Sequence, residues 1–503
     1  MRRFAPLAAA LCLCGALAQT CVASASGADR PAARTPDALG GYSAAAPSSP
    51  VAAPPSPSCG HTPIDPLDCA TAAAPANTSP GASSPPGQTS SDWSIVPSPD
   101  AKYAVGLLSA VSCISSADCW AAGYTYADYT HGWYQTLVEH WDGSAWSLAT
   151  SPDTSADEGN RLSAITCVAA ADCWAAGYHT VSGGASQTLI QHWDGASWTI
   201  TPSANTSASS DNLLLGLRCN TVSDCWAVGY TVTQGIEQTL AEHWDGIAWS
   251  VSPTTDTSTS QNNLLAAITC TSTAACWGVG AAASGVNGHY QTLIERWNGA
   301  AWTTATSADT LPVNDDALDS VSCTSVADCW SVGLSGTSAG DQTLAEHWDG
   351  AAWSVVATGD TSATETNLLT GVSCISATQC WAVGSAASGT GGALQSLVEQ
   401  WNGSSWSIVT SPNTGVSLRN VLYAVACTTA DRCFAVGYSF PGYIQTLVDT
   451  LSGSAWVITP SPNAVTVTSQ IQSVLDAATC SSDTSCWAVG YYETPYVYQT
   501  LIE

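Results

Sequence analysis

The sequence predicts an all-β protein, an eight-bladed β-propeller with four strands in each blade. Three observations lead to this fold class. A unit of about fifty residues recurs eight times between Leu107 and the end of the chain. Each copy contains two cysteines separated by five residues, and the first cysteines of successive copies are 51 to 54 residues apart. Each copy also contains four short apolar segments, which is the repeat pattern of a propeller.

The four predicted strands of the first copy illustrate the unit. They read LSAVSC, CWAAGY, QTLVEHWDG and AWSLAT, at residues 108–113, 119–124, 135–143 and 145–150. The residues between the two cysteines are small and polar, which favours a hairpin loop. The Asp-Gly or Asn-Gly pair after the third segment indicates a tight turn, because glycine adopts a positive φ without steric cost. Each copy therefore predicts four antiparallel strands.

The cysteines predict one disulfide in every blade. The first cysteine ends one strand and the second begins the next, so a bond between them would clip the two strands together. Disulfide-rich chains are typical of oxidising compartments. One further pair, in the N-terminal part of the chain, predicts a local disulfide loop. The predicted pairs are Cys113–Cys119, Cys167–Cys173, Cys219–Cys225, Cys270–Cys276, Cys323–Cys329, Cys374–Cys380, Cys427–Cys433, Cys480–Cys486 and Cys59–Cys69.

The last copy stops before its fourth strand. It ends on YQTLIE, Tyr498–Glu503, where the other copies continue into a turn and a second tryptophan strand. An unmatched segment, SDWSIVPSPD, precedes the first copy at Ser91–Asp100. It resembles the fourth strand SSWSIVTSPN, which begins at Ser404. We expect this N-terminal strand to complete the eighth blade and close the ring.

The residues before the propeller predict an export signal and a spacer. Residues 1–25 combine two arginines with a short apolar run and a small-residue cleavage motif, the layout of a secretory signal peptide. Residues 26–90 are mainly Ala, Pro, Ser, Thr and Gly, so we expect a flexible linker without a core. The propeller is predicted to span residues 91–503. Lipidation of Cys21 stays open, although the residues before it fit a lipoprotein motif poorly.

The charge of the chain limits its partners. Ten Lys and Arg stand against 39 Asp and Glu, a formal net charge of −29. Such a chain lacks the basic surface that nucleic-acid binding requires, and anionic membranes would repel it. No second long apolar segment follows the leader, so we expect no membrane span. These features predict a secreted or cell-surface protein, and we expect it to be a monomer.

The unit resembles the kelch repeat, the family of propellers that includes galactose-oxidase-like domains. The segments that carry the resemblance are CWAVGY, Cys225–Tyr230, and EHWDGIAW, Glu242–Trp249. It extends from Trp93 to the end of the chain, with the single Gly229 where kelch blades have a glycine pair. The resemblance implies binding of proteins or carbohydrates and, in a minority of members, catalysis. The radical-copper members use a Tyr–Cys crosslink, and the repeat leaves no propeller cysteine for one, so no cofactor is expected.

Residues that recur in most copies are expected to hold the blades together. Of the 22 tryptophans, 21 lie at repeated positions, which predicts core packing. Four histidines precede a third-strand tryptophan in separate blades, too far apart to form one site. We expect the acids before them to hydrogen-bond to neighbouring backbone. The histidines are His140, His192, His243 and His347, and the acids are Glu139, Glu242, Glu295, Glu346, Glu399, Asp449 and Glu503, with Gln191 in the second copy.

Two acidic runs contain oxygen atoms that could bind Ca²⁺. They are DTSADEGN, Asp153–Asn160, and NDDALD, Asn314–Asp319. Carboxylate oxygens are ligands that Ca²⁺ prefers, but neither run has the spacing of a known calcium loop. We therefore predict ordinary solvated loops, and no metal site.

The unrepeated aromatic residues gather in loops between second and third strands. Copies seven, eight and one carry YSFPGYI, YYETPYVY and YTYADYTHGWY, whereas copies five and six carry small residues. Because ring closure makes these three blades neighbours, we predict an aromatic binding surface there. Tyr124, Tyr438 and Tyr491 could instead pack between blades. The predicted binding residues are Tyr126, Tyr129, Trp133, Tyr134, Phe440, Tyr443, Tyr492, Tyr496 and Tyr498.

These observations predict a non-catalytic binding module for a glycan or protein partner. Tyrosine and tryptophan present flat apolar faces with polar edges, which suits both ligand classes. Two alternatives stay open. An extracellular hydrolase or lyase acting on polysaccharide would need unrepeated acids or histidines at the axial mouth of the ring, and we find no such cluster in the sequence. A purely structural envelope protein would have no saturable ligand.

Overall fold

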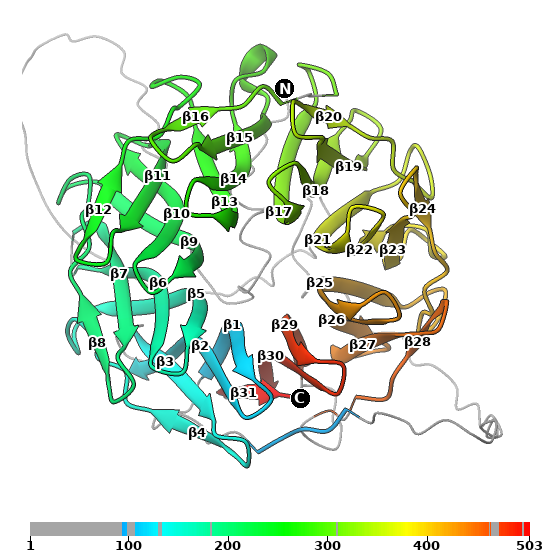
Figure 1. Ribbon diagram of the computed structural model, residues 1–503. Coiled ribbons are helices and arrows are strands. Elements are labelled where there is room, and N and C mark those ends of the chain that lie inside the picture. The colour runs from blue at the N-terminus through cyan, green and yellow to red at the C-terminus, as the bar shows by residue number, and fades with distance from the viewer. Residues whose placement is uncertain are drawn as a thin grey trace, which may run out of the picture. The chain divides into compact units, whose positions relative to one another are not determined.

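The predicted all-β, eight-bladed propeller is confirmed. The described residues form 31 β-strands in eight sheets, which surround a central axis in a ring (Figure 1). The predicted leader, the linker and the Cys59–Cys69 pair lie outside these residues. The computed structural model describes residues 93–97, 106–128, 133–181, 184–307, 310–461, 463, 472–494 and 497–503.

Blades one to four each contain four antiparallel strands, hydrogen-bonded in chain order. Blade one consists of β1 (Gly106–Ser115), β2 (Asp118–Asp128), β3 (Trp133–Trp141) and β4 (Trp146–Ala149). Blade two consists of β5 (Gly159–Ala169), β6 (Asp172–Thr180), β7 (Ser186–Trp193) and β8 (Trp198–Thr201). Blade three consists of β9 (Asp211–Thr221), β10 (Asp224–Thr233), β11 (Ile236–Trp244) and β12 (Trp249–Ser252). Blade four consists of β13 (Asn263–Ser272), β14 (Ala275–Ala282), β15 (Gln291–Trp297) and β16 (Trp302–Thr304), with the 3₁₀ turn η1 (Val286–Gly288) after β14.

Blades five to seven repeat this arrangement, and the sheet of blade eight has three strands. Blade five consists of β17 (Asp315–Ser325), β18 (Asp328–Gly336), β19 (Asp341–Trp348) and β20 (Trp353–Val355). Blade six consists of β21 (Asn367–Ser376), β22 (Gln379–Ala386), β23 (Gln395–Trp401) and β24 (Trp406–Ile408). Blade seven consists of β25 (Arg419–Thr429), β26 (Arg432–Phe440), β27 (Gln445–Ser452) and β28 (Ala455–Ile458). Blade eight consists of β29 (Gln472–Ser482), β30 (Ser485–Thr494) and β31 (Val497–Ile502).

The first strand of each blade lies nearest the axis and packs against the first strands of both neighbouring blades (Figure 1). A bulge interrupts its pairing with the second strand, for example between Leu108 and Ala110. Opposite the bulge, the second strand carries the glycine of the repeat. A Cβ atom on Gly229 would lie 2.0 Å from the carbonyl oxygen of Leu213, and one on Gly123 would lie 1.9 Å from that of Leu107. The repeat therefore needs glycine here because the first strand leaves no room for a side chain.

All eight predicted propeller disulfides are present. Each joins cysteines that face one another across the first and second strands, as Cys113 and Cys119 do. Their Cα atoms are 3.9 to 4.1 Å apart, and each bond spans only six residues of sequence. The disulfides therefore clip hairpins within blades and do not join one blade to another.

Tryptophans pack each blade onto the next. Trp120 of blade one meets Trp198 of blade two edge-on, with ring centroids 5.3 Å apart, and both rings are at most 4% exposed. The ring centroid of Trp193 lies 4.7 Å from that of Trp120. Such aromatic pairs contribute about 0.5–1.5 kcal/mol beyond the burial of their area. The edge-on contact recurs in Trp174–Trp249, Trp226–Trp302, Trp277–Trp353, Trp330–Trp406, Trp381–Trp456 and Trp487–Trp146.

The N-terminal segment closes the ring, as the sequence predicts. The backbone N–H of Val96 donates to the carbonyl oxygen of Ile502 in β31 at 3.0 Å. Blade six has the same bond between its fourth and third strands, from Val409 N–H to Val398 O at 2.9 Å. Trp93 also makes the edge-on contact of a fourth-strand tryptophan, with Phe434 of blade seven at 5.3 Å. Residues 93–97 therefore take the place of the missing fourth strand.

Candidate functional site

The four repeated histidines are each held within their own blade. His140 Nε2 lies 2.9 Å from Asp118 Oδ1, and its ring stacks on Trp120 with centroids 4.0 Å apart. In blade four, Ala275 replaces the aspartate and Arg296 replaces the histidine, and the guanidinium lies over the equivalent tryptophan. Because the two partners change together, we interpret these pairs as framework contacts. The other pairs are His192–Asp172, His243–Asp224 and His347–Asp328.

The repeated third-strand acids hold the loop that arrives from the preceding blade. They are at most 3% exposed. A carboxylate oxygen of Glu242 accepts from the N–H of Ala204 at 3.3 Å, and one of Glu399 accepts from the N–H of Gly359 at 3.0 Å. Gln191 does the same work in blade two through its amide, which donates to the carbonyl oxygen of Pro152. The predicted hydrogen bonds to neighbouring backbone are therefore present for Glu242, Glu295 and Glu399. Glu346, Asp449 and Glu503 instead accept from the hydroxyl groups of Ser307, Ser411 and Ser461.

Burial shifts the acids of this ring toward their neutral form. It raises the pKa of Glu242 and Glu295 to about 8, against the opposing effect of the hydrogen bonds that their carboxylates accept. Burial likewise raises the pKa of Glu399, Asp449 and Glu503 to about 7. Burial removes solvent from around a carboxyl group, which disfavours its charged form and raises its pKa. These buried acids therefore carry much less negative charge near neutral pH than their number in the sequence suggests.

The two acidic runs serve as loop caps. Asp153 Oδ1 accepts from the N–H of Thr136 at 2.7 Å, and Asp316 Oδ2 accepts from the N–H of Thr310 at 2.9 Å. Asparagine fills the place of Asp153 in blades two, six and seven, so a negative charge is not needed there. The residues equivalent to Asp153 with the same bond are Asn205, Asp256, Asp360, Asn413 and Asn463.

The tyrosines of blades seven, eight and one form one continuous apolar cluster. Three of them, Tyr124, Tyr438 and Tyr491, are buried, which agrees with the alternative that they pack between blades. Four others are partly buried around them, and all pack on apolar residues of β1, β25 and β29. The structure thus brings together both ends of the propeller sequence. We name as the tyrosine cluster Tyr124, Tyr126, Tyr134, Tyr423, Tyr438, Tyr491 and Tyr498.

The outer members of the tyrosine cluster interact through their hydroxyl groups. Tyr126 donates to the hydroxyl of Tyr134 at 2.8 Å, and the two ring centroids are 4.5 Å apart. Tyr124 meets Tyr134 edge-on at 5.0 Å. Burial raises the pKa of Tyr124 to about 12 and shifts the pKa values of Tyr126 and Tyr498 upward as well. The cluster therefore presents neutral phenols that can donate hydrogen bonds.

Two charged residues beside the cluster were missed by the sequence reasoning. The guanidinium of Arg161 in β5 lies over the ring of Tyr124, 4.6 Å from its centroid. Asp476 lies in β29, and burial raises its pKa to about 7, although Arg161 acts in the opposite direction. An alignment of the eight first strands would have found both, because Arg161 replaces an apolar residue and Asp476 shares its position with only one other acid, Asp319.

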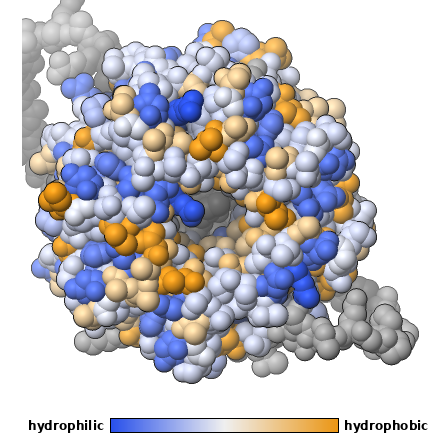
Figure 2. Space-filling view, viewed as in Figure 1, coloured by the Kyte–Doolittle hydropathy of each residue, from blue (hydrophilic) through white to orange (hydrophobic). Residues whose placement is uncertain are grey.

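The other predicted binding residues have varied surroundings. Phe440 ends β26 and is 42% exposed. Tyr492 packs toward the core between blades seven and eight, and its hydroxyl donates to Gln499 Oε1. Tyr129 and Tyr496 lie outside the described residues. Figure 2 shows one face of the ring, hollowed at its centre, with hydrophilic and hydrophobic side chains interspersed around the hollow. The remaining predicted binding residues are partly buried. They are Tyr126, Trp133, Tyr134, Tyr443 and Tyr498.

Two kinds of feature are absent from the described residues. No group of three or more His, Cys, Asp or Glu side chains in this part of the chain could hold a metal ion. No helix among the same residues is long and apolar enough to cross a membrane.

Comparison with known proteins supports the fold. No family model matches the sequence, and no curated protein matches it. Sqt1 from Chaetomium thermophilum is similar in structure, with a TM-score of 0.52 and 10% identity over 82% of this chain and 97% of that chain. The same protein bound to the N-terminus of the ribosomal protein L10 gives a TM-score of 0.51 and 10% identity, over 82% and 99% of the two chains. At this identity the likeness shows a propeller fold alone, and the resemblance to kelch repeats stays a prediction.

Proposed function

We propose that this chain is an exported, non-catalytic binding module that recognises a glycan or a protein through the surface around the tyrosine cluster. The observation that carries this proposal is the meeting of tyrosines from blades seven, eight and one in one cluster whose outer members stay partly exposed. The framework residues recur in most blades, whereas tyrosines at these positions are concentrated in blades seven, eight and one. Their counterparts elsewhere are Tyr178, Tyr230 and Tyr290. Exposed aromatic groups of this kind mark interaction sites more often than they mark packing.

The chemistry of the surface favours recognition over catalysis. Neutral phenols donate hydrogen bonds, and their ring faces offer apolar area at a low cost in side-chain entropy. Arg161 and Asp476 add one positive and one titratable group beside these rings. Sqt1, a propeller of similar fold, has been solved with a bound polypeptide. A polypeptide partner is therefore compatible with this architecture.

Two features support export. Eight disulfides are typical of proteins in an oxidising environment. Residues 1–25 have the layout of a secretory signal peptide. We accordingly place the module outside the cell, free or associated with the cell surface.

A glycan array and capture from extracellular protein fractions would test the proposal. The full chain would be compared with the double variant Trp133→Ala/Phe440→Ala, which truncates two of the predicted binding residues that are not members of the tyrosine cluster. Loss of aromatic contacts should cost about 2 kcal/mol of binding free energy, or roughly thirtyfold in affinity. Val286→Ala is the matched control, because Val286 is 49% exposed in the corresponding loop of blade four. A ligand that binds all three proteins equally, or no saturable ligand at all, would count against the proposal.

A further inference from the structure

The first strand of every blade contains one residue that has no partner in the second strand. This residue lies at the bulge, as Asp319 does between Leu318 and Ser320 in β17. A bulge takes one side chain out of the regular alternation of its strand and re-aims it. We name these eight residues the axial ring. They are Ser109, Ser163, Leu215, Ala266, Asp319, Thr370, Tyr423 and Asp476.

The axial ring faces the hollow at the centre of the propeller. All eight residues are partly accessible, whereas the leucine that precedes each of them is 0% exposed. First strands lie nearest the axis and pack against first strands on both sides, so we assign this accessibility to the central hollow that Figure 2 shows. The sequence reasoning found no unrepeated acids at the axis. The strand register places Asp319 and Asp476 there.

The chemistry of the axial ring is uneven. Blades one to four contribute two serines, a leucine and an alanine, whereas blades five to eight contribute Asp319, Thr370, Tyr423 and Asp476. The leucine before the bulge is present in all eight copies. Variable polar side chains on a constant framework are typical of a binding site. We name these four residues the polar arc.

The members of the polar arc lie close to one another across blade boundaries. The hydroxyl of Thr370 donates to the carbonyl oxygen of Leu422 in blade seven at 2.9 Å, and Tyr423 follows Leu422 in the same strand. Tyr423 and Asp476 both act on the pKa of Tyr491, so these two lie near a common side chain. The arc is therefore continuous from blade six to blade eight.

One end of the polar arc already has a positive partner. Burial raises the pKa of Asp476 to about 7, and the charge of Arg161 acts against this rise. The same guanidinium lies over the ring of Tyr124, 4.6 Å from its centroid. A carboxylate and an aromatic ring thus attract one organic cation, which the propeller supplies from blade two.

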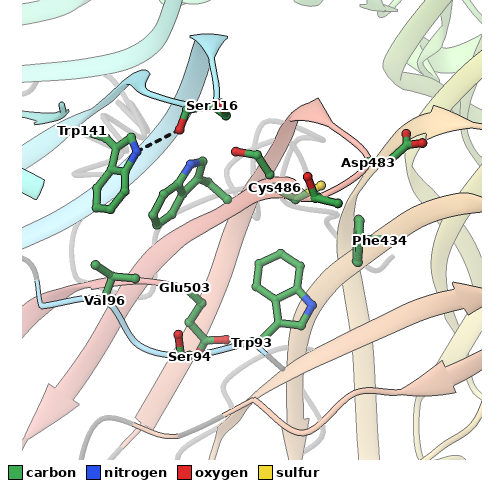
Figure 3. A pocket seen from close by; sticks show the side chains of 12 residues that line it. Trp93, Ser94, Val96, Ser116, Trp141, Phe434, Asp483, Cys486 and Glu503 are labelled. Atoms are coloured by element: carbon green, nitrogen blue, oxygen red, sulfur yellow. Dashed lines mark hydrogen bonds between the residues drawn. The ribbon is translucent and has the colours of Figure 1, made fainter. Parts of the chain in front are cut away.

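The other end of the polar arc has no such partner. Burial raises the pKa of Asp319 to about 7, with no hydrogen bond or positive charge to oppose it. Acids at the blade junctions are held differently. Glu503, which lies beside Ser94 in Figure 3, accepts from the hydroxyl of Ser461. Within the described part of the chain, the carboxyl of Asp319 has neither a hydrogen-bond partner nor an ion-pair partner.

We propose that the polar arc binds a small organic cation, whose ammonium or guanidinium group contacts the carboxylate of Asp319. The hydroxyl of Thr370 can accept a further hydrogen bond from this group, and the ring of Tyr423 can pack on its alkyl chain. The net charge of −29 favours entry of cations into the hollow. A metal ion fits less well, because no group of three acidic, histidine or cysteine side chains among the described residues could hold one.

Isothermal titration calorimetry of the full chain with agmatine would test this proposal. Agmatine carries a guanidinium and a primary ammonium group on a short alkyl chain. We expect saturable binding at one site per chain, and Asp319→Asn and Asp319→Ser should each weaken it at least about tenfold. Serine is the residue of blades one and two at this position, so the second variant should fold. Near-ultraviolet circular dichroism would establish that both variants keep the fold.

Asp245→Asn is the matched control. It removes the same charge at an exposed turn, where blades four and six have Asn298 and Asn402. Equal weakening by Asp245→Asn and Asp319→Asn would mean that agmatine responds to net charge alone, and would overturn the proposal. Absence of saturable binding, or tighter binding of Ca²⁺ than of agmatine, would overturn it as well.

The axial site can be tested separately from the proposed function, because it shares only Tyr423 and the neighbouring Arg161 and Asp476 with the surface proposed above. The variant Trp133→Ala/Phe440→Ala should bind agmatine as the wild type does. Loss of agmatine binding in that variant would contradict an axial site. Retained agmatine binding, together with failure to find a glycan or protein ligand, would leave the axial site standing and count against the proposed function alone.

Discussion

Blades two to six and blades seven, eight and one share one backbone plan but use their side chains differently. In the first group, every junction repeats the same tryptophans, and the loops between second and third strands carry few aromatic residues. In the second group, Phe434 and Leu451 replace tryptophans, and the tyrosine cluster occurs there. The departures from the repeat therefore concentrate around the ring closure. Residues that are buried between two blades tolerate few substitutions. Blades seven, eight and one nevertheless differ most from the repeat.

Removal of the segment that closes the ring is expected to have the largest effect on stability. Deletion of residues 91–97 should expose the core faces of blades seven, eight and one that Trp93, Ile95 and Val96 cover. The loss of three large apolar side chains should cost well over about 3 kcal/mol of unfolding free energy. Chemical denaturation would measure it, with deletion of residues 26–85 as the control. Equal stability of the two deletion proteins would contradict the closure.

Glycine substitutions would show whether the framework of the two groups is equally strict. Gly229→Ala in blade three and Gly490→Ala in blade eight would place Cβ atoms 2.0 and 2.1 Å from backbone oxygens. Each should destabilise the protein by about 3 kcal/mol, because the first strand would have to move. Gly184→Ala, whose nearest neighbour is 3.4 Å away, is the control. A harmless Gly490→Ala would mean that blade eight is the looser blade.

The ring of buried acids predicts how stability depends on pH. The pKa of Glu242 is about 8 in the native state and near 4.5 in the unfolded chain, so the native state holds the proton more tightly. Its contribution is full below pH 4.5 and is lost as the pH rises toward 8. Glu242→Gln should therefore gain up to about 4 kcal/mol of unfolding free energy at pH 8 and almost nothing at pH 4.

Blade two already has the amide, which makes it the natural test of that prediction. Gln191→Glu should destabilise the protein at pH 8 by a similar amount and should have little effect at pH 4. Urea denaturation at the two pH values would measure both variants. Identical shifts at pH 4 and pH 8 would show that packing, and not ionisation, accounts for the difference.

The smallest effect on stability is expected at Arg161. Arg161→Leu restores the residue that blades one and three have at this position, Leu107 and Leu213, so unfolding free energy should change by less than about 1 kcal/mol. The loss of the guanidinium should nevertheless raise the pKa of Asp476 above about 7. NMR titration of aspartate carboxyl carbons would measure that shift. A large loss of stability would place Arg161 with the framework residues.

Most of the fold could be predicted because the same four-strand pattern occurs eight times in the sequence. The cysteine spacing, the Asp-Gly turns and the match between residues 91–100 and a fourth strand depend on local sequence alone. The sequence left open that Tyr124 packs between blades, and it does. The contact of Arg161 with the ring of Tyr124 depends on how neighbouring blades face one another. No short stretch of sequence contains that geometry.

The short span of each disulfide has a consequence for how the chain matures. The correct partner of Cys113 is six residues away, whereas the first cysteine of the next blade lies 48 residues beyond Cys119. Closing the longer loop costs about 2 kcal/mol more in chain entropy, a preference of roughly twentyfold for the local bond. Each hairpin can therefore be oxidised correctly before the rest of the propeller has folded. The native disulfide pairs can form before the last strand, β31, joins its sheet, with little need for an isomerase.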